Sequence, residues 1–528
     1  MQKVLKAKEM AYADEKTITN TGIHSLVLME NAGRTASEII INRYSQKEEF
    51  LIVAGSGNNG GDGLVIARYL HKAGKKVEVL ILAESKEKLS KDNLKNLEIF
   101  QKINGKVSFV TKQNLRKLTN AVKKTQIVID AIFGTGFTPP VKGYREKAIQ
   151  IINKYSKPII SIDIPSGLSA DTGTIYPTFI KANLTITFAF PKLCHILYPA
   201  SQYCGDIYIV DISIDEKYLK NIHRYIIQPS KVKLPLRKKD SHKYANGHTL
   251  VIGGSTGKTG AVIMASKASN VSGAGLVTAV VPKSLNPICE QTLIEEMTIP
   301  IDDQNGIFGK NSPKEIKQII KQGKYTSIVV GMGMSVNPYT KNLIKEILTI
   351  SKPVVIDADG LNNLANLENF EKLLIDRKES TVLTPHIGEM SRLTGYETSY
   401  ILENMEEVAK QFALKTRTYV VLKSARTVIA TPNEEVYYSI TGNEGMATAG
   451  TGDILAGIIG TMVSRLNPKD AVITGVTLHG IAGDLAVEEV GKESLKATDL
   501  LLFIPKAYKT LENLKESKEI FSFYQKLI

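Results

Sequence analysis

The chain has 528 residues, too many for one ordinary hydrophobic core, so we expect at least two domains. Hydrophobic residues make up 43% of it and charged residues 23%, which excludes an intrinsically disordered chain. The net charge of +14 is spread along the chain without a basic stretch interleaved with aromatic residues, so we expect no nucleic-acid partner.

The cysteine content argues against both a disulfide scaffold and a cysteine zinc site. Cys194, Cys204 and Cys289 form no CxxC pair, and their small number is typical of a reducing compartment. The N-terminus lacks the apolar core of a signal peptide, and no run approaches the ~20 apolar residues of a membrane helix. We therefore expect a cytoplasmic protein without membrane attachment. We also expect a homo-oligomer.

The first part of the chain alternates between apolar runs and helical patterns. Residues 3–44 read as helical. Buried strands are predicted at 50–55, 77–82, 127–134, 158–167 and 184–190. Apolar runs separated by helices indicate a parallel sheet covered on both faces, so we predict a Rossmann-like three-layer α/β/α sandwich for residues 1–215.

This alternation stops near residue 211, where the chain becomes charged, irregular and proline-bearing. We place a linker at 216–240 and a second domain at 241–528. Strands are predicted there at 248–254, 274–282, 327–333, 353–360, 381–386 and 418–424. A long helical pattern follows over residues 454–528. The second domain is therefore also predicted to be an α/β/α sandwich.

The first predicted strand is followed by GSGNNGGDG (55–63), which contains the G-x-G-x-x-G pattern of dinucleotide-binding folds. A lone match of this kind is weak and by itself favours a dinucleotide oxidoreductase. The full segment is more specific, because it offers clustered backbone N–H groups, amide oxygens and the Asp62 carboxylate to a ligand. The alternative interpretation is a glycine-rich turn without a ligand.

Polar residues also follow two later strands of the first domain. Asp130 ends one strand, and Asp163 and Ser166 lie at the end of the next. Ligands bind beyond the carboxyl ends of parallel strands, so these segments should converge on one crevice. Asn59, Asp130 and Ser166 offer hard oxygen ligands to a cation, which leaves Asp163 as the acid or base. For any single Asp, a helix cap is the alternative.

Five motifs of residues 1–215 resemble the epimerase domain of the NAD(P)H-hydrate repair proteins. They are LMENAGR (28–34), NNGGDG (58–63), DAIFGTGF (130–137), SIDIPSGL (161–168) and DTG (171–173). The resemblance implies interconversion of the R and S forms of a hydrated nicotinamide cofactor, with K⁺ held by Asn59, Asp130 and Ser166. The implied hydrate-binding residues are Asn58, Asn59, Gly60, Gly61, Asp62, Gly134, Thr135, Gly136, Phe137, Thr138, Pro139, Pro140 and Asp163.

The second domain contains a different phosphate-site pattern. GGSTGKTG (253–260) is one residue short of a P-loop, so we interpret it as a turn. In GNEGMATAGTGDILAGIIG (442–460), AGTGD opens a helix whose free N–H groups and dipole would stabilise charge on a transferring phosphoryl group. Asp453 in its first turn is placed to take a proton from an attacking hydroxyl. The alternative is a first-turn acid that only favours the dipole.

Other polar residues at strand ends fit the same pocket. DADGLN (357–362) offers two carboxylates, and Lys423 follows a strand at a position suited to a phosphate. His386 and Glu389 follow another strand, so we predict substrate contact for His386 rather than a structural role alone. Glu389 is placed to reach Mg²⁺ through water.

This half resembles the ribokinase-like superfamily through its G-x-G-D anion hole. GAGLVTAV, VVIDADGLN, LTPHIGEM, VLKSART and GNEGMATAGTGDILAG are similar to ADP-dependent NAD(P)H-hydrate dehydratases. The resemblance implies that the hydroxyl of S-NADH hydrate or S-NADPH hydrate attacks the terminal phosphoryl of ADP. Phosphate then leaves, which yields NAD(P)H and AMP as metabolite repair.

The resemblance also assigns residues in this half. Hydrate contacts are implied at Ala261, Gly333, His386 and Asp453. Nucleotide contacts are implied at Lys423, Ser424, Ala425, Arg426, Thr427, Asn443, Glu444, Gly445, Met446, Ala447, Thr448, Ala449, Gly450, Thr451 and Gly452. Ser424 stands where the family commonly has Gly, and Met332 stands in a turn that is commonly Gly-Pro-Gly.

Two other functions stay open from the sequence. One is a ribokinase-like small-molecule kinase with a dinucleotide-binding regulatory domain. The other is a non-enzymatic ligand-binding module joined to a degenerate kinase fold, which the intact Asp453 and its glycines disfavour.

Overall fold

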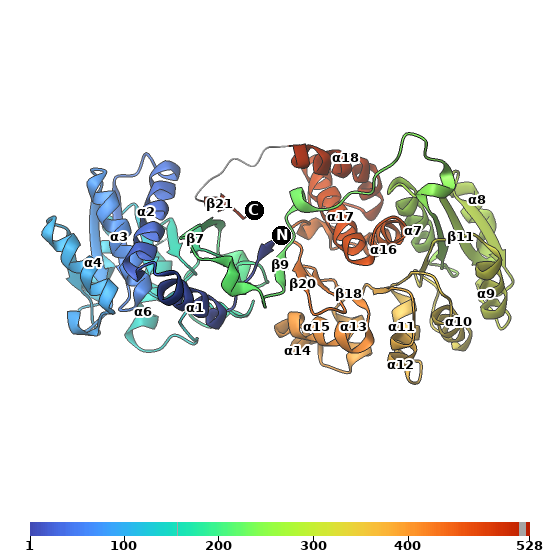
Figure 1. Cartoon of the computed structure of the whole chain (residues 1–528), viewed down its shortest axis with the longest axis horizontal. Helices are drawn as coiled ribbons and strands as arrows, with labels where there is room; N and C mark the ends of the chain where they lie inside the picture. The colour runs from blue at the N-terminus through green and yellow to red at the C-terminus, as the bar shows by residue number, and fades with distance from the viewer. Residues whose placement is uncertain (156, 517–523, 528) are drawn as a thin grey trace. The chain divides into compact units, whose positions relative to one another are not determined.

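The computed structural model describes residues 1–155, 157–516 and 524–527, and the chain forms two compact units. The N-terminal unit ends at Ile222, and the C-terminal unit begins at His223. Residues 1–2 belong to the C-terminal unit, and strand β21 (Tyr524–Lys526) belongs to the N-terminal unit. Each unit is a largely parallel sheet flanked by helices, which confirms the predicted α/β class (Figure 1).

The sheet of the N-terminal unit has the order β21-β8-β7-β6-β5-β2-β3-β4. Its strands are β2 (Glu49–Ala54), β3 (Lys76–Ile81), β4 (Lys106–Phe109), β5 (Ile127–Ala131), β6 (Ile159–Ile162), β7 (Leu184–Phe188) and β8 (Asp206–Val210). Its helices are α1 (Ala7–Lys16), α2 (Ser25–Arg43), α3 (Asn58–Lys72), α4 (Lys91–Lys102), α5 (Arg116–Lys124) and α6 (Tyr144–Lys154). The strand order reverses between β2 and β5, where ligands bind in such sheets.

Both faces of this sheet are buried, which explains why its strands read as continuous apolar runs. Phe50 and Ile52 of β2 enter one core with α2, α3 and α4. Leu51 and Val53 enter the other with α5 and α6. Successive side chains of a strand point to opposite faces, so two helical layers require the buried residues of β2, Phe50 to Ala54, to be apolar.

The sheet of the C-terminal unit includes strands in the order β9-β20-β19-β18-β17-β16-β15-β10-β11-β12. Their bounds are β9 (Arg224–Ile226), β10 (His248–Ile252), β11 (Leu276–Pro282), β12 (Met297–Ile301), β15 (Ser327–Val330), β16 (Val354–Ile356), β17 (Thr381–Leu383), β18 (Tyr419–Leu422), β19 (Val428–Ala430) and β20 (Val436–Tyr438). β13 (Asp303–Gln304) and β14 (Ile307–Phe308) form a separate hairpin. The strands from β18 to β12 are parallel, and β19 is antiparallel to both of its neighbours.

The helices of the C-terminal unit cover this sheet. They are α7 (Thr259–Val271), α8 (Asn286–Thr292), α9 (Ser312–Gln322), α10 (Pro338–Leu348), α11 (Asp359–Ala365), α12 (Phe370–Ile375), α13 (Ile387–Thr394), α14 (Thr398–Glu403), α15 (Met405–Thr416), α16 (Thr451–Val463), α17 (Pro468–Val490) and α18 (Ala497–Glu516).

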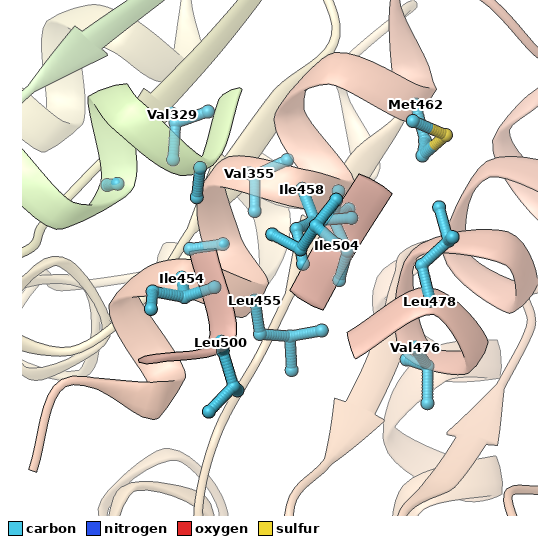
Figure 2. Close-up of a cluster of buried hydrophobic side chains, with 14 of the residues drawn as sticks. Val329, Val355, Ile454, Leu455, Ile458, Met462, Val476, Leu478, Leu500 and Ile504 are labelled. Atoms are coloured by element: carbon cyan, nitrogen blue, oxygen red, sulfur yellow. The ribbon is translucent and has the colours of Figure 1, made fainter. Parts of the chain in front are cut away.

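Helix α16 lies between the sheet and its neighbours α7, α17 and α18. Figure 2 shows its residues Ile454, Leu455 and Ile458 packed among side chains of the sheet, α17 and α18. A Cβ on Gly457 would lie 2.2 Å from the carbonyl oxygen of Ala265 in α7, and one on Gly460 would lie 2.1 Å from Val329 of β15. These contacts leave α16 no room to shift, so they fix where the helix begins.

The structure corrects the predicted domain boundaries. The expected linker at 216–240 contains β9, which pairs with β20 inside the C-terminal sheet. Strand β21, predicted to belong to the second domain as part of a long helix, pairs with β8 of the N-terminal sheet. The two strands are three residues long, too short to show a periodicity in the sequence.

The structure also changes the expectation about membrane-like segments. Within the described ranges, α17 alone has the length and apolar composition of a spanning helix, although no such run was expected. Of its most apolar 18-residue stretch, 72% is buried inside the protein, because α17 packs against α16 and α18. Its composition is therefore that of a core helix.

Candidate functional sites

A cavity of about 540 Å³ opens in the N-terminal unit at the ends of β2, β5 and β6, where the strand order reverses. The predicted site residues that line it are Asn58, Asn59, Asp62, Gly134, Thr135, Gly136, Phe137 and Asp163. The predicted residues that do not line it are Gly60, Gly61, Thr138, Pro139 and Pro140. Met10 of α1 and Leu28 and Met29 of α2 supply apolar walls.

The glycine-rich segment forms the first turns of α3 rather than a loop, because this helix begins at Asn58. Gly60 serves packing: a Cβ there would lie 2.1 Å from the carbonyl oxygen of Gly55. Asn93 of α4 donates from Nδ2 to the carbonyls of Gly55 and Gly57, at 3.0 and 2.7 Å. No side chain of the described residues caps the helix. The backbone N of Gly60 donates to the carbonyl of Gly57 at 3.1 Å, which leaves the amides of Asn58 and Asn59 at the cavity wall.

Asp163 is the most constrained side chain of the cavity. It follows β6 with a φ of +69°, in the left-handed region that few non-glycine residues occupy. Its Oδ1 accepts a hydrogen bond from Lys192 Nζ at 2.7 Å, and its Oδ2 accepts from the backbone N and the hydroxyl of Thr135. Burial alone would raise the pKa of Asp163, but Lys192 and the Thr135 bonds outweigh burial and lower the pKa to about 2. Asp163 is therefore an anion at neutral pH.

Two other carboxyls of the cavity behave in the opposite way. Asp14 of α1 and Asp62 of α3 make no hydrogen bond or ion pair with the described residues. Burial raises the pKa of Asp14 to about 6, with Lys192 opposing and Asp163 reinforcing the change. Burial and the Asp163 charge raise the pKa of Asp62 well above its usual range. The cavity thus combines one carboxyl of lowered pKa with two of raised pKa, a pattern typical of acid–base sites.

Sequence reasoning missed Lys192 and Asp14. Lys192 is 1% exposed, and its ammonium also donates to Thr187 Oγ1 at 2.8 Å and to the Phe188 carbonyl at 3.1 Å. A lysine between two apolar segments carries no sign of burial in the sequence. Asp14 lies in an amphipathic helix that carries no recognisable motif. Only the folded chain brings both residues to the cavity.

The three predicted cation ligands lie near one another. Asp130 is fully buried, and Ser166 Oγ donates to it at 2.6 Å and Ser161 Oγ at 2.8 Å. Asn59 donates from Nδ2 to the carbonyl of Ile162, at the end of β6. Its Oδ1 is buried without a hydrogen-bond partner. A buried amide oxygen without a hydrogen-bond partner can serve as a ligand to a monovalent cation, so these residues fit such an ion.

In the C-terminal unit, polar side chains converge at the carboxyl ends of the neighbouring strands β16, β17 and β18. Asp357 Oδ1 accepts from Lys423 Nζ at 2.7 Å and from Thr384 Oγ1 at 2.8 Å. Burial would lower the pKa of Lys423, but Asp357 and Glu389 outweigh burial and raise it. Lys423 is therefore a fixed cation of the type that binds phosphate.

The start of α16 adjoins this cation. Gly450 precedes the helix with a φ of +95°, and no side chain caps it. A Cβ on Gly452 would lie 3.2 Å from Lys423 Nζ. Asp453 forms no hydrogen bond or ion pair with the described residues. Burial first, and then Asp357, raise its pKa to about 7 against the effect of Lys423. Such a pKa suits a general base at neutral pH.

His386 has a structural task that the sequence left open. It caps α13, accepting at Nδ1 from the backbone N of Gly388 at 2.9 Å and of Glu389 at 3.3 Å. The side chain is 55% exposed, and its segment forms a bridge with Lys423. Burial raises the pKa of the neighbouring Glu389 to about 7. The capping role occupies Nδ1, and Nε2 lies 3.4 Å from Oε1 of Glu389.

The other predicted hydrate residues, Ala261 and Gly333, form a neighbouring pair. A Cβ on Gly333 would lie 3.2 Å from the Cβ of Ala261. One on Gly450 would lie 2.6 Å from the Cε of Met264, one turn beyond Ala261 in α7. The start of α7 therefore lies beside the start of α16. Met332, which departs from the family turn, is fully buried.

Hydrogen bonds join the first predicted nucleotide segment (423–427) to Ser439 and Ile440, which precede the second one (443–452). Arg426 donates to the carbonyl of Ile440 at 2.9 Å, and the backbone N of Ser439 donates to the carbonyl of Thr427 at 3.1 Å. Ser424 is exposed, so its side chain is accommodated in solvent. The antiparallel strands β19 and β20 connect these segments, and neither strand was predicted.

Comparisons with known proteins divide the chain in a similar way. Residues 25–194 match the family of the YjeF-related protein N-terminus, and residues 249–506 match the NAD(P)H-hydrate dehydratase family. The solved ADP/ATP-dependent NAD(P)H-hydrate dehydratase from Bacillus subtilis, co-crystallised with ATP/Mg²⁺, is 29% identical. It has a TM-score of 0.48, with 54% of this chain and 96% of that chain covered.

Relatives also match across both units. The chain is 38% identical over 520 residues to the bifunctional NAD(P)H-hydrate repair enzyme Nnr of Moorella thermoacetica, covering 96% of this chain and 97% of that protein. It is 34% identical over 518 residues to the enzyme of the same name from Thermofilum pendens, covering 98% of each. The family suggested by the sequence motifs is thereby confirmed. The chain belongs to the bifunctional NAD(P)H-hydrate repair enzymes, with an epimerase-like N-terminal unit and a dehydratase C-terminal unit.

Proposed function

We propose that the C-terminal unit dehydrates S-NADH hydrate or S-NADPH hydrate with ADP as co-substrate, and that Asp453 is its base. The observation that carries this proposal is the uncapped start of α16 beside Lys423, with an unpaired carboxyl in its first turn. Asp453 takes the proton from the hydrate hydroxyl as that oxygen attacks the terminal phosphoryl of ADP. AMP departs, and elimination of phosphate from the new ester restores the cofactor.

Lys423 and the first amides of α16 supply the charge stabilisation in this step. Negative charge that develops on the phosphoryl oxygens meets an ammonium held by Asp357 and unsatisfied N–H groups. Ala261, Gly333 and His386 are the proposed contacts to the hydrate, and residues 423–427 and 443–452 the proposed contacts to the nucleotide.

We also infer a role for Mg²⁺ in this unit. In the described parts of the chain, no three His, Cys, Asp or Glu side chains are arranged to hold a metal. Mg²⁺ does not require such a set, because it keeps several waters and binds largely through nucleotide phosphates. Glu389 would reach it through water, and the ion would neutralise phosphate charge.

For the N-terminal unit, we propose epimerisation of the hydrated carbon inside the 540 Å³ cavity. Asp163, kept ionised by Lys192, accepts hydrogen bonds from the hydrate and orients it. Asp62 and Asp14 hold protons more readily and are placed to protonate the hydroxyl, which leaves as water and adds back to the opposite face of the same carbon with return of the proton. A K⁺ ion at Asn59, Asp130 and Ser166 would supply fixed positive charge beside this anion.

One experiment tests both activities. Purified protein is mixed with racemic NADH hydrate, with and without ADP and Mg²⁺. We expect full conversion to NADH only with ADP, release of free phosphate, and continued interconversion of the two epimers without it. A stable phosphorylated product would instead identify a small-molecule kinase.

The three unpaired cysteines support a reducing, cytoplasmic location, which fractionation of the source cells would test.

A further inference from the structure

One face of α17 contacts most of the segment 441–452, yet no residue of α17 has been given a role. The residues on this face are His479, Gly480, Gly483, Asp484 and Val487. Their spacing of i, i+1, i+4, i+5 and i+8 places them on a single stripe of the helix. Helix α17 itself is held rigidly, since its other residues pack in the core with α16 and α18 (Figures 1 and 2).

Two glycines of the stripe allow the segment to lie directly on the helix. A Cβ on Gly480 would lie 2.2 Å from Oγ1 of Thr441, and one on Gly483 would lie 2.2 Å from Sδ of Met446. Both distances are far below van der Waals contact. A larger residue at either position would therefore push the segment away from the helix.

The polar residues of the stripe define the path of the segment. Asp484 Oδ2 accepts from the backbone N of Gly442 at 2.9 Å, and Oδ1 accepts from Asn443 Nδ2 at 2.9 Å. Asn443 in turn accepts from the backbone N of Gly445 at 3.0 Å. Gly442 has a φ of +97°, so the chain turns sharply where Asp484 holds it.

His479 connects the same stripe to the start of α16. Its Nε2 lies 2.9 Å from the carbonyl oxygen of Thr451, an acceptor, so this nitrogen carries the hydrogen. Burial lowers the pKa of His479 to about 4, which keeps the ring neutral. The segment is thus held at Asp484 near its beginning and at His479 near its end.

We propose that Asp484 is a positioning residue for nucleotide binding, acting through Gly442 and Asn443 to hold segment 441–452 in its binding conformation. This inference rests on the proposed nucleotide role of that segment. Asp484 does not itself touch substrate in this arrangement. Its two carboxylate oxygens each match one donor of the segment, so a side chain with only one acceptor atom cannot replace it.

The test uses Asp484→Asn in the full chain, with ADP and Mg²⁺ as the probe and isothermal titration calorimetry as the measurement. The new amide group faces a donor of the segment, so one hydrogen bond becomes a donor–donor contact. We expect the Kd for ADP to rise about ten- to hundredfold. Epimerisation and the KM for the hydrate should change less than twofold.

A reciprocal exchange separates positioning from loss of charge. In the double variant Asp484→Asn/Asn443→Asp, the new Asn accepts from Gly442 and donates to the new Asp, which still accepts from Gly445. We expect the melting temperature of the ADP-free protein to return to near the wild-type value, because both hydrogen bonds of Asp484 to the segment are re-formed. Asn443→Asp alone should lower the melting temperature because two carboxylates face each other.

Asp470→Asn serves as the matched control, because it removes an acid of the same helix that pairs with Lys233 instead. The proposal is overturned if Asp484→Asn binds ADP normally, if the double variant melts at as low a temperature as Asp484→Asn, or if Asp470→Asn weakens ADP binding equally. A wild-type protein that binds no ADP would refute the proposed nucleotide site instead, so the two failures are distinguishable.

Discussion

Replacing Asp453 by Asn tests the chemistry of the dehydratase unit most directly. The change keeps the shape of the side chain and removes its basicity. General-base catalysis contributes about 10²–10⁴-fold to a rate, equivalent to roughly 3–5 kcal/mol of barrier. An acid that only interacts with the helix dipole contributes about 0.3–1 kcal/mol, or roughly two- to fivefold. The two interpretations of Asp453 therefore differ by well over an order of magnitude.

The pH dependence gives a second measurement of the same residue. With a pKa of about 7, Asp453 is half ionised near neutrality in the free enzyme. A base acts only when deprotonated, so kcat/KM for dehydration should fall about tenfold per pH unit below 7 and level off above it. Asp453→Asn should lose this acid limb.

The assay follows recovery of NADH absorbance from S-NADH hydrate and ADP, with epimerisation measured on the same preparation as the internal standard. Asp470→Asn is the control, because Asp470 is a first-turn acid of α17 as Asp453 is of α16. A loss of less than tenfold in Asp453→Asn, or an equal loss in the control, would refute the assignment of Asp453 as the base.

Three predictions concern the N-terminal unit. Lys192→Met leaves Asp163 as an unpaired buried charge, so calorimetry should show that the free energy of unfolding falls by about 3–5 kcal/mol. Adding Asp163→Asn should largely restore it. An unaltered melting curve of Lys192→Met would contradict the buried ion pair. Replacing K⁺ in the buffer by a bulky organic cation should slow epimerisation but not dehydration. Asn59→Leu should make the epimerisation rate independent of K⁺. A wild-type epimerisation rate that does not depend on the cation would exclude the cation site. Gly60→Ala should lower the free energy of unfolding in denaturant by about 1–3 kcal/mol, since its Cβ would lie 2.1 Å from a carbonyl oxygen. Gly57→Ala is the control and should lower it less, because a Cβ at Gly57 would meet no atom within 4 Å.

The sequence by itself determined the two α/β/α folds and the motifs at the strand ends. Runs such as FLIVA are apolar throughout because both faces of the sheet are covered, and this leaves a clear signal. Asp163, Lys423 and Asp453 were predicted as site residues because each lies where a predicted strand ends or a predicted helix begins. That information is local, so no knowledge of distant residues was needed.

Only the tertiary structure decided which residues share a site and how their protons are distributed. Lys192 meets Asp163, and His479 and Asp484 meet residues 442–451, across separations that no local pattern encodes. The short strands β9 and β21 likewise depend on partners far along the chain. A pKa of about 2 for Asp163 and about 7 for Asp453 arises from burial and from neighbouring charges, quantities that exist only once the chain is folded.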